Sequence, residues 1–243
     1  MIKRFEAKLI RLSQAFFYFL TLIVHLLVYF PFLRLKLIGK ENIPKKGRFI
    51  LAANHNNFYD GFFLAYSVIP FKRISFLIAK RSVRSPFLQY LAWLIGSVLI
   101  GNEAEEYQKS LKKLNKILSH GGAVGIFPEG DVSNKKIPKK FKGGVAKLSL
   151  DTKTKVIPVY INGTYGLRNF KYWLERPEIT LRFGKPLELY NFAAVCGNNL
   201  DLMAENLREK IIELIDDNKQ ENLNFSGFES TVSAYNKTLQ TLP

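Results

Sequence analysis

Cysteine is almost absent from this sequence of 243 residues, in which Cys196 is the only one. A single cysteine cannot form a disulfide within the chain, and no pair of cysteine or histidine residues stands at the spacing of zinc ligands. We therefore expect a protein of a reducing compartment, with no structural metal and no metal in its functional site.

Acidic residues are also few. The chain has 36 lysines and arginines against 20 aspartates and glutamates, a formal net charge of +16, which favours binding to polyanionic surfaces such as membranes and nucleic acids. No helix-turn-helix, zinc or aromatic RNA-binding motif accompanies the lysines, so we expect membrane lipids and no nucleic acid as partners. The hydrophobic share of 47% predicts one catalytic-sized domain with a sizeable core.

Charge is missing altogether from residues 15–33, a run rich in Phe, Leu, Ile, Val and Tyr that is just long enough to span a hydrocarbon core. The run passes through Pro31 into Arg34 without the small-residue cleavage site of a signal peptide. Basic residues flank this run on both sides, so the positive-inside rule predicts no orientation across a membrane. A segment that dips into one leaflet and returns, or that lies in the interface, therefore fits better than a crossing helix. We predict that residues 1–33 form a membrane-associated helical segment on the cytosolic face; a buried hairpin of a soluble protein is the alternative.

The rest of the chain alternates between patterns typical of strands and of helices. Apolar runs predict strands at residues 35–38, 48–53, 74–79, 123–127, 156–161 and 179–183. Helical spacing and capping residues predict helices at residues 60–66, 86–94, 107–118, 143–150 and 203–214. This alternation predicts an α/β domain over residues 34–219, with a mostly parallel, twisted sheet flanked by helices and a site at the carboxyl ends of its strands. We expect residues 220–243 to be a weakly ordered polar tail.

A histidine and an aspartate follow the second predicted strand. Asn54 and His55 come directly after it, and Asp60 stands where the next helix begins. A carboxylate placed in this way can bond to one imidazole nitrogen, fix the tautomer and leave the other nitrogen to accept a proton from a hydroxyl. The pair is two thirds of a Ser-His-Asp arrangement, with the alcohol of a substrate in place of the serine. Taken alone the spacing is weak evidence, because aspartates are common at helix starts.

Four sequence blocks together resemble the glycerolipid acyltransferase family, whose members carry an HX4D motif. In order along the chain they are Asn54-His55 through Asp60, Phe76-Leu77-Ile78-Ala79-Lys80 continuing to Gly96-Ser97-Val98-Leu99-Ile100, Ile126-Phe127-Pro128-Glu129-Gly130 with Phe141-Lys142-Gly143-Gly144, and Val156-Ile157-Pro158-Val159-Tyr160. Their order and spacing over residues 35–186 carry the resemblance.

The resemblance implies an enzyme and gives roles to four residues. His55 would be the catalytic general base and Asp60 its orienting catalytic partner, while Glu129 and Gly130 would bind substrate by shaping the acceptor pocket. The reaction implied moves a fatty acyl group from acyl-CoA or acyl carrier protein, a co-substrate rather than a bound cofactor, to the free hydroxyl of a lysophospholipid. The first candidate acceptor is 1-acylglycerol-3-phosphate, which would give phosphatidate in phospholipid biosynthesis. Direct attack of the alcohol on the thioester needs no acyl-enzyme.

Two positions depart from the family pattern. Asn102 and Val132 stand where the family has arginines associated with the acceptor phosphate, and neither side chain can bind phosphate as an arginine fork does. We therefore add Lys80 and Lys142 as substrate-binding candidates that could replace the lost charge. Ser133 is a further substrate-binding candidate, with an ordinary turn as the alternative.

Other interpretations stay open from the sequence. The loop after Ser133 carries Lys135, Lys136, Lys139 and Lys140, and contact with anionic lipid is one explanation for it. The acceptor could be a different lysolipid without the terminal phosphate. The chain could also be a catalytically impaired homologue that only binds membranes, although the intact His55 and Asp60 argue against this.

Overall fold

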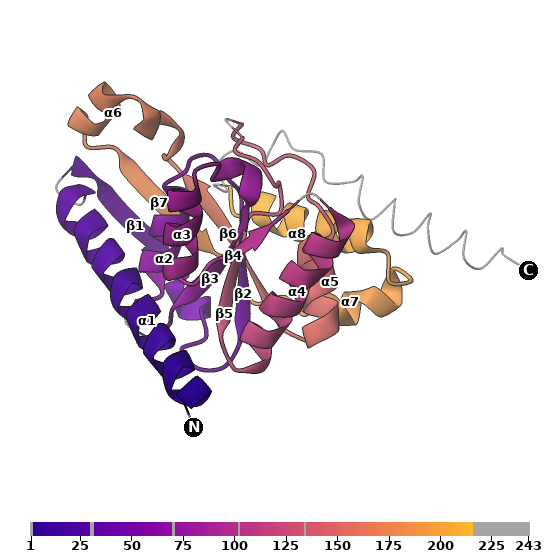
Figure 1. Ribbon diagram of the computed structural model, residues 1–243. Helices are drawn as coiled ribbons and strands as arrows, with labels where there is room; N and C mark the ends of the chain where they lie inside the picture. The colour runs from indigo at the N-terminus through magenta and orange to yellow at the C-terminus, as the bar shows by residue number, and fades with distance from the viewer. Residues whose placement is uncertain (1, 30–31, 70, 102, 134, 216–243) are drawn as a thin grey trace, which may run out of the picture.

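A seven-stranded sheet forms the centre of the computed structural model, which describes residues 2–29, 32–69, 71–101, 103–133 and 135–215 (Figure 1). The strands are β1 (Arg34–Ile38), β2 (Phe49–Ala53), β3 (Ile74–Ala79), β4 (Val98–Ile100), β5 (Ala123–Ile126), β6 (Val156–Asn162) and β7 (Glu178–Phe183). Their order across the sheet is β1-β7-β6-β2-β5-β3-β4. Neighbouring strands are parallel except β6 and β7, which are antiparallel. The predicted mostly parallel sheet is confirmed.

Strand β2 lies in the middle of the sheet because it can be covered on both faces. Every residue of β2 is buried, as is usual for a parallel strand between two layers of helices. Its side chains alternate between the two faces. Phe49 and Leu51 belong to one core cluster, and Ile50 and Ala52 belong to the other. The carboxyl end of β2 is therefore enclosed by its neighbours β5 and β6.

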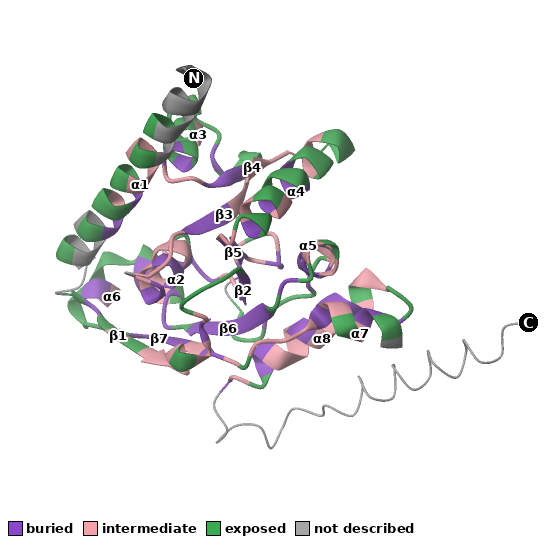
Figure 2. Cartoon of the chain, turned by 90° about the horizontal axis from the view of Figure 1, so that it is seen from below, coloured by how far each residue is buried: buried purple, intermediate pink, exposed green. Residues whose placement is uncertain are grey.

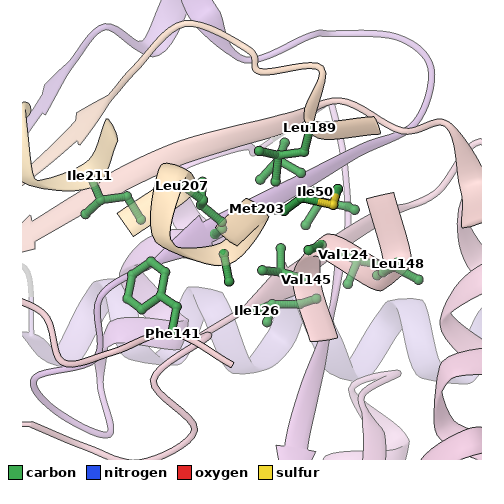
Figure 3. Close-up of a cluster of buried hydrophobic side chains, with 14 of the residues drawn as sticks. Ile50, Val124, Ile126, Phe141, Val145, Leu148, Leu189, Met203, Leu207 and Ile211 are labelled. Atoms are coloured by element: carbon green, nitrogen blue, oxygen red, sulfur yellow. The ribbon is translucent and has the colours of Figure 1, made fainter. Parts of the chain in front are cut away.

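Helices cover both faces of the sheet, as Figure 2 shows. One face packs against α4 (Ala104–Ser119), α5 (Gly144–Thr152), α7 (Leu189–Val195) and α8 (Leu200–Ile212). Side chains of α5, α7 and α8 surround Ile50 and Val124 in this core cluster (Figure 3). The opposite face packs against α1 (Ile2–Tyr29), α2 (Asp60–Ser67), the 3-10 turn η4 (Tyr165–Arg168) and α6 (Phe170–Leu174). Helix α3 (Pro86–Leu94) contacts α1 and β4, and the 3-10 turns η2 (Lys40–Asn42) and η3 (Lys80–Ser82) complete the described elements.

Helix α1 corrects part of the prediction for the N-terminal segment. It runs without a break from Ile2 to Tyr29, so the chain neither dips and returns nor forms a hairpin within these residues. Its inner side packs on the domain through the buried Tyr18 and Leu22, and the Tyr18 hydroxyl accepts a hydrogen bond of 3.2 Å from the amide of Ile74. Among the described residues, no helix combines the length and the apolarity that crossing a bilayer requires.

Among the strands and α-helices that the structure describes, three short ones were not expected from the sequence. They are β4, α6 and α7, with 3, 5 and 7 residues, and segments of this length are too short to display a hydrophobic period. The longer predicted strands and helices are confirmed, with ends shifted by a few residues. The predicted polar tail at residues 220–243 and the departure at Asn102 lie outside the described residues.

Candidate active site

Asn54 fixes the point at which the chain leaves β2. Its side chain is fully buried; Nδ2 donates to the carbonyl of Ile161 at 2.9 Å, and Oδ1 accepts from the amide of Ile161 at 2.7 Å. The backbone register of β2 with β6 ends one residue earlier, where Ala53 faces Val159. The amide side chain of Asn54 therefore takes the place of a further backbone rung, and His55 follows from a fixed position.

His55 and Asp60 meet as their spacing predicted. Asp60 is the first residue of α2, and its Oδ2 atom lies 2.9 Å from Nδ1 of His55. The same oxygen accepts hydrogen bonds from the amides of Asn56 at 2.6 Å and Asn57 at 2.8 Å. The amino end of a helix also favours a negative charge. The carboxylate is thus held in one orientation by the turn that connects β2 to α2.

The two side chains differ in their access to solvent. Asp60 is completely buried, whereas the His55 side chain is 19% exposed. With the Nδ1 proton directed to Asp60, the other ring nitrogen, Nε2, is the proton acceptor. A substrate can reach His55 but not Asp60, so Asp60 can act only through His55.

A stack of three rings fixes the plane of the imidazole. The His55 ring lies on Phe127, with centroids 4.1 Å apart and planes inclined by 16°. Phe127 lies on Phe76 of β3, with centroids 6.1 Å apart. Gly125 of β5 leaves room for this arrangement, because a Cβ atom at that position would clash with the Phe76 ring. Stacking and the bond to Asp60 together leave His55 little freedom to rotate.

The side chain of Glu129 holds the main chain of His55 in place. Its Oε1 accepts a hydrogen bond of 2.8 Å from the amide of His55, and its Oε2 accepts one of 3.0 Å from the amide of Lys139. The side chain is buried, at 6% exposure. Because both oxygens are occupied by backbone donors, this geometry favours a positioning role for Glu129. Its predicted contact with the acceptor stays a prediction.

Ser133 also contacts the main chain of His55. It is 1% exposed, and its amide donates to the carbonyl of His55 at 2.6 Å. The hydroxyl accepts from the amide of Lys135 at 3.3 Å, as in a local serine turn. The turn interpretation therefore fits the structure better than substrate contact, which no observation tests.

Gly130 and Lys142, two of the substrate-binding candidates, lie close together. Gly130 has a φ of 77°, a conformation that favours glycine, and a Cβ atom there would lie 2.5 Å from Nζ of Lys142. The amide of Lys142 donates to the carbonyl of Pro128 at 2.9 Å. Among the described residues, the Lys142 ammonium forms no ion pair. A free positive charge thus lies beside the loop that holds His55.

Lys80 is paired on another element, and its predicted contact with the acceptor stays a prediction. Lys80 forms an ion pair with Glu106 of α4. Arg81 instead reaches the loop beside His55: its Nη2 lies 2.6 Å from Oδ1 of Asp131 and 3.1 Å from the carbonyl oxygen of Gly130. The structure therefore brings Lys142 and Arg81, rather than Lys80, to Gly130.

Sequence reasoning missed three contributions to this site. Asn54 and Phe127 were recognised as parts of motifs, but their contacts with Ile161 and His55 were not foreseen. A polar amide directly after an apolar strand is a signal that could have indicated the role of Asn54. Arg81 carries no such signal, because it lies 49 residues from Gly130 in the chain and only the fold brings the two together.

Known proteins resemble this chain in sequence and in fold. A family model described as Acyltransferase matches residues 34–162. A 1-acyl-sn-glycerol-3-phosphate acyltransferase of Borreliella burgdorferi is 31% identical over 135 residues, which are 54% of this chain and 51% of that protein. The protein of the same name from Bacillus subtilis is 27% identical over 181 residues, 74% of this chain and 87% of that protein. A Chlamydomonas reinhardtii protein named likewise is 28% identical over 187 residues, 74% of this chain and 53% of its own length.

The chain thus spans about half the length of two of these relatives. The fold is similar to the crystal structure of the 1-acyl-sn-glycerophosphate (LPA) acyltransferase PlsC from Thermotoga maritima, with a TM-score of 0.57 and 22% sequence identity. The similar region covers 75% of this chain and 73% of that one. It supports the α/β architecture with a mostly parallel sheet flanked by helices.

Proposed function

We propose that this chain, which belongs to the acyltransferase family, transfers a fatty acyl group from an acyl thioester to the free hydroxyl of a lysophospholipid. One observation carries the proposal: a partly exposed imidazole, His55, has its Nδ1 held by the buried carboxylate of Asp60. The acceptor we favour is 1-acylglycerol-3-phosphate, the substrate in the names of the relatives. Acyl-CoA or acyl carrier protein would deliver the acyl group as a co-substrate.

The geometry supports direct transfer. Nε2 of His55 takes the proton of the acceptor hydroxyl while the hydroxyl oxygen attacks the thioester carbonyl carbon. Asp60 stabilises the imidazolium that forms. When the tetrahedral intermediate collapses, the carbon–sulfur bond breaks and the imidazolium returns the proton to the sulfur, which leaves an ester and a free thiol. No protein side chain is acylated in this scheme, and the only thiol, Cys196, is buried in the core.

Membrane association of α1 is part of the proposal. Large apolar side chains are exposed along its outer side, namely Leu9, Ile10, Leu12, Phe16, Phe17, Phe19, Leu20, Ile23 and Leu27. Helix α3 adds Phe87, Leu88, Tyr90, Leu91 and Trp93. The two helices are in contact, and Nε2 of Gln14 donates to the carbonyl of Trp93 at 2.9 Å. A continuous apolar surface of this kind marks an interaction site, and we propose that it lies in the interface of the cytosolic leaflet.

Acyl transfer can be tested directly. Purified protein in detergent is given acyl-CoA or acyl carrier protein as donor and a panel of lysolipids with and without a terminal phosphate, and products are identified by mass spectrometry. We expect acylation of 1-acylglycerol-3-phosphate. Absence of product from every acceptor with both donors contradicts the proposal.

A phosphate-free lysolipid is the second candidate acceptor. It is favoured by Asp131, a carboxylate that is 60% exposed and stands next to Gly130, where it repels an anionic acceptor. The same panel decides between the two candidates. Equal or faster acylation of the phosphate-free lysolipid would exclude phosphatidate synthesis as the main activity and leave the broader assignment of lipid acyl transfer.

A further inference from the structure

Arg81 and Asp131 form an exposed ion pair on the loop that supports His55. The Nη2 atom of Arg81 makes both contacts of this side chain, one with Oδ1 of Asp131 and one with the carbonyl of Gly130. Its Nη1 and Nε atoms have no partner among the described residues. The side chains are 44% and 60% exposed. Exposed pairs of this kind are weak, so another anion can replace the Asp131 carboxylate.

The loop under this ion pair is tied to the base. Phe127 stacks on the His55 ring, the amide of Gly130 donates to the carbonyl of Phe127 at 3.0 Å, and the amide of Ser133 donates to the carbonyl of His55. Asp131 lies between these attachments. An anion that replaces the Asp131 carboxylate on Arg81 is therefore bound beside a loop that is tied to His55.

A second cation lies on the same loop. A Cβ atom built on Gly130 would lie 2.5 Å from Nζ of Lys142, so the ammonium lies close to this residue, while Arg81 contacts the carbonyl of the same residue. Two positive groups from different elements, η3 and the segment before α5, thus meet at Gly130. A phosphate has enough oxygens to accept from a guanidinium fork and an ammonium together.

From these contacts we propose that Arg81 is the residue that selects an acceptor with a terminal phosphate, and that Asp131 occupies its guanidinium until the phosphate replaces it. The proposal rests on the proposed acyl transfer and deepens it by naming the group that recognises the acceptor. Arg81 supplies a guanidinium where Val132 cannot, and Lys142 supplies a second charge. Asp131 lowers the affinity for the phosphate because the acceptor must displace it.

The position of Arg81 also suits a lipid acceptor. Turn η3 is followed after three residues by α3, whose Phe87 and Leu88 are exposed on the apolar surface proposed to contact the membrane. An acyl chain on that surface would place its headgroup at η3. In a lysophosphatidate the free hydroxyl is separated from the phosphate by only two carbons and an ester oxygen. Arg81 contacts Gly130 and Asp131, which belong to the loop that is tied to His55.

The test compares Arg81→Ala with Arg84→Ala, an exposed arginine in the same segment that has no partner among the described residues. Both are assayed with a lysophosphatidate and with a monoacylglycerol of the same acyl chain. Arg81→Ala is expected to raise the KM for lysophosphatidate about 10-fold or more with a much smaller change in kcat. The preference for lysophosphatidate over the monoacylglycerol, measured as the ratio of their kcat/KM values, should therefore fall. Arg81→Lys should restore part of that ratio, and Arg84→Ala should leave it as in the wild type.

Asp131→Asn should change the KM for lysophosphatidate in the opposite direction. Removing the competing carboxylate should lower the KM for lysophosphatidate several-fold, by up to roughly 5-fold for an exposed pair. The same substitution in the Arg81→Ala background should have a smaller effect, because the guanidinium for which the carboxylate competes is gone. If Arg81→Ala leaves the ratio of the two acceptors unchanged, or changes both acceptors equally, the assignment is wrong.

Calorimetric binding of lysophosphatidate separates this inference from the proposed function, because it needs no turnover. If the wild type and Arg81→Ala bind the lipid equally well, Arg81 does not recognise the phosphate, whether or not acyl transfer occurs. If binding depends on Arg81 but no acyl group is transferred to any acceptor, the phosphate site stands and the proposed function is wrong.

Discussion

Oδ2 of Asp60 accepts a hydrogen bond of 2.9 Å from Nδ1 of His55, while Oδ1 of the same carboxylate is buried without a partner among the described residues. All the hydrogen bonds of this side chain thus converge on one oxygen. An asparagine at this position can keep its carbonyl oxygen where Oδ2 is and place its amide group at Oδ1. The geometry therefore allows the charge of Asp60 to be removed without removing the hydrogen bonds that shape the turn.

This relationship predicts different effects for two substitutions. His55→Ala should lower kcat/KM about 100- to 10,000-fold, because no other described side chain can take the hydroxyl proton. Asp60→Asn should retain more activity and a Tm near that of the wild type. Both are measured by steady-state kinetics and thermal unfolding. A His55→Ala protein with more than about a tenth of wild-type turnover and a normal Tm would exclude His55 as the base.

Glu129 should behave as a positioning residue. In Glu129→Gln one carboxylate oxygen becomes an NH2 group, which cannot accept from the amide of His55 or of Lys139. We expect a loss of about 1 to 3 kcal/mol in the free energy of unfolding and a lower kcat, with little change in the KM for the acceptor. Glu105→Gln is the control, because its ion pair with Lys109 is exposed. A large rise in KM with unchanged stability would instead support direct acceptor contact by Glu129.

The apolar side of α1 predicts how the protein binds membranes. Deleting residues 1–33 would also remove Tyr18 and Leu22 from the core, so single outward substitutions are the cleaner test. Phe16→Glu should reduce binding to anionic vesicles at least about tenfold, since burial of a phenylalanine contributes roughly 1.5 to 3 kcal/mol. Gln108→Glu makes the same change in charge on α4, which covers the opposite face of the sheet. Co-sedimentation that falls equally for both variants would show that net charge, and not α1, controls binding.

Glu209, which lies outside the active site, should make the stability of the protein depend on pH. Burial, together with the neighbouring Glu205 and Glu213, raises the pKa of Glu209 from 4.5 to about 7. Between these values the folded state binds more protons than the unfolded state, so Glu209 makes stability fall as the pH rises through this interval. Glu209→Gln should therefore raise the Tm at pH 8 relative to the wild type and have little effect at pH 4. Thermal unfolding at both pH values, with Glu105→Gln as control, tests this; an equal shift at both pH values would contradict it.

The sequence by itself determined those parts that depend on residues close together in the chain. The uninterrupted apolar run of β2 predicted a strand, and the five-residue interval between His55 and Asp60 predicted their meeting, because a short turn between a strand and a helix leaves few alternatives. The uncharged stretch at residues 15–33 predicted a helix, but not whether it turns back. That depended on packing: an unbroken helix can bury Tyr18 and Leu22 against the domain along its length.

Only the tertiary structure decided which distant groups surround His55. The two oxygens of Glu129 could have faced a substrate or the main chain, and the amides of His55 and Lys139 occupy them because the loops after β2 and β5 meet at one edge of the sheet. Lys80 and Arg81 are adjacent in sequence and equally charged, yet one pairs with Glu106 and the other reaches Gly130. The pattern of residues carries no sign of this choice, because it follows from the direction in which η3 presents each side chain to elements that lie far away in the chain.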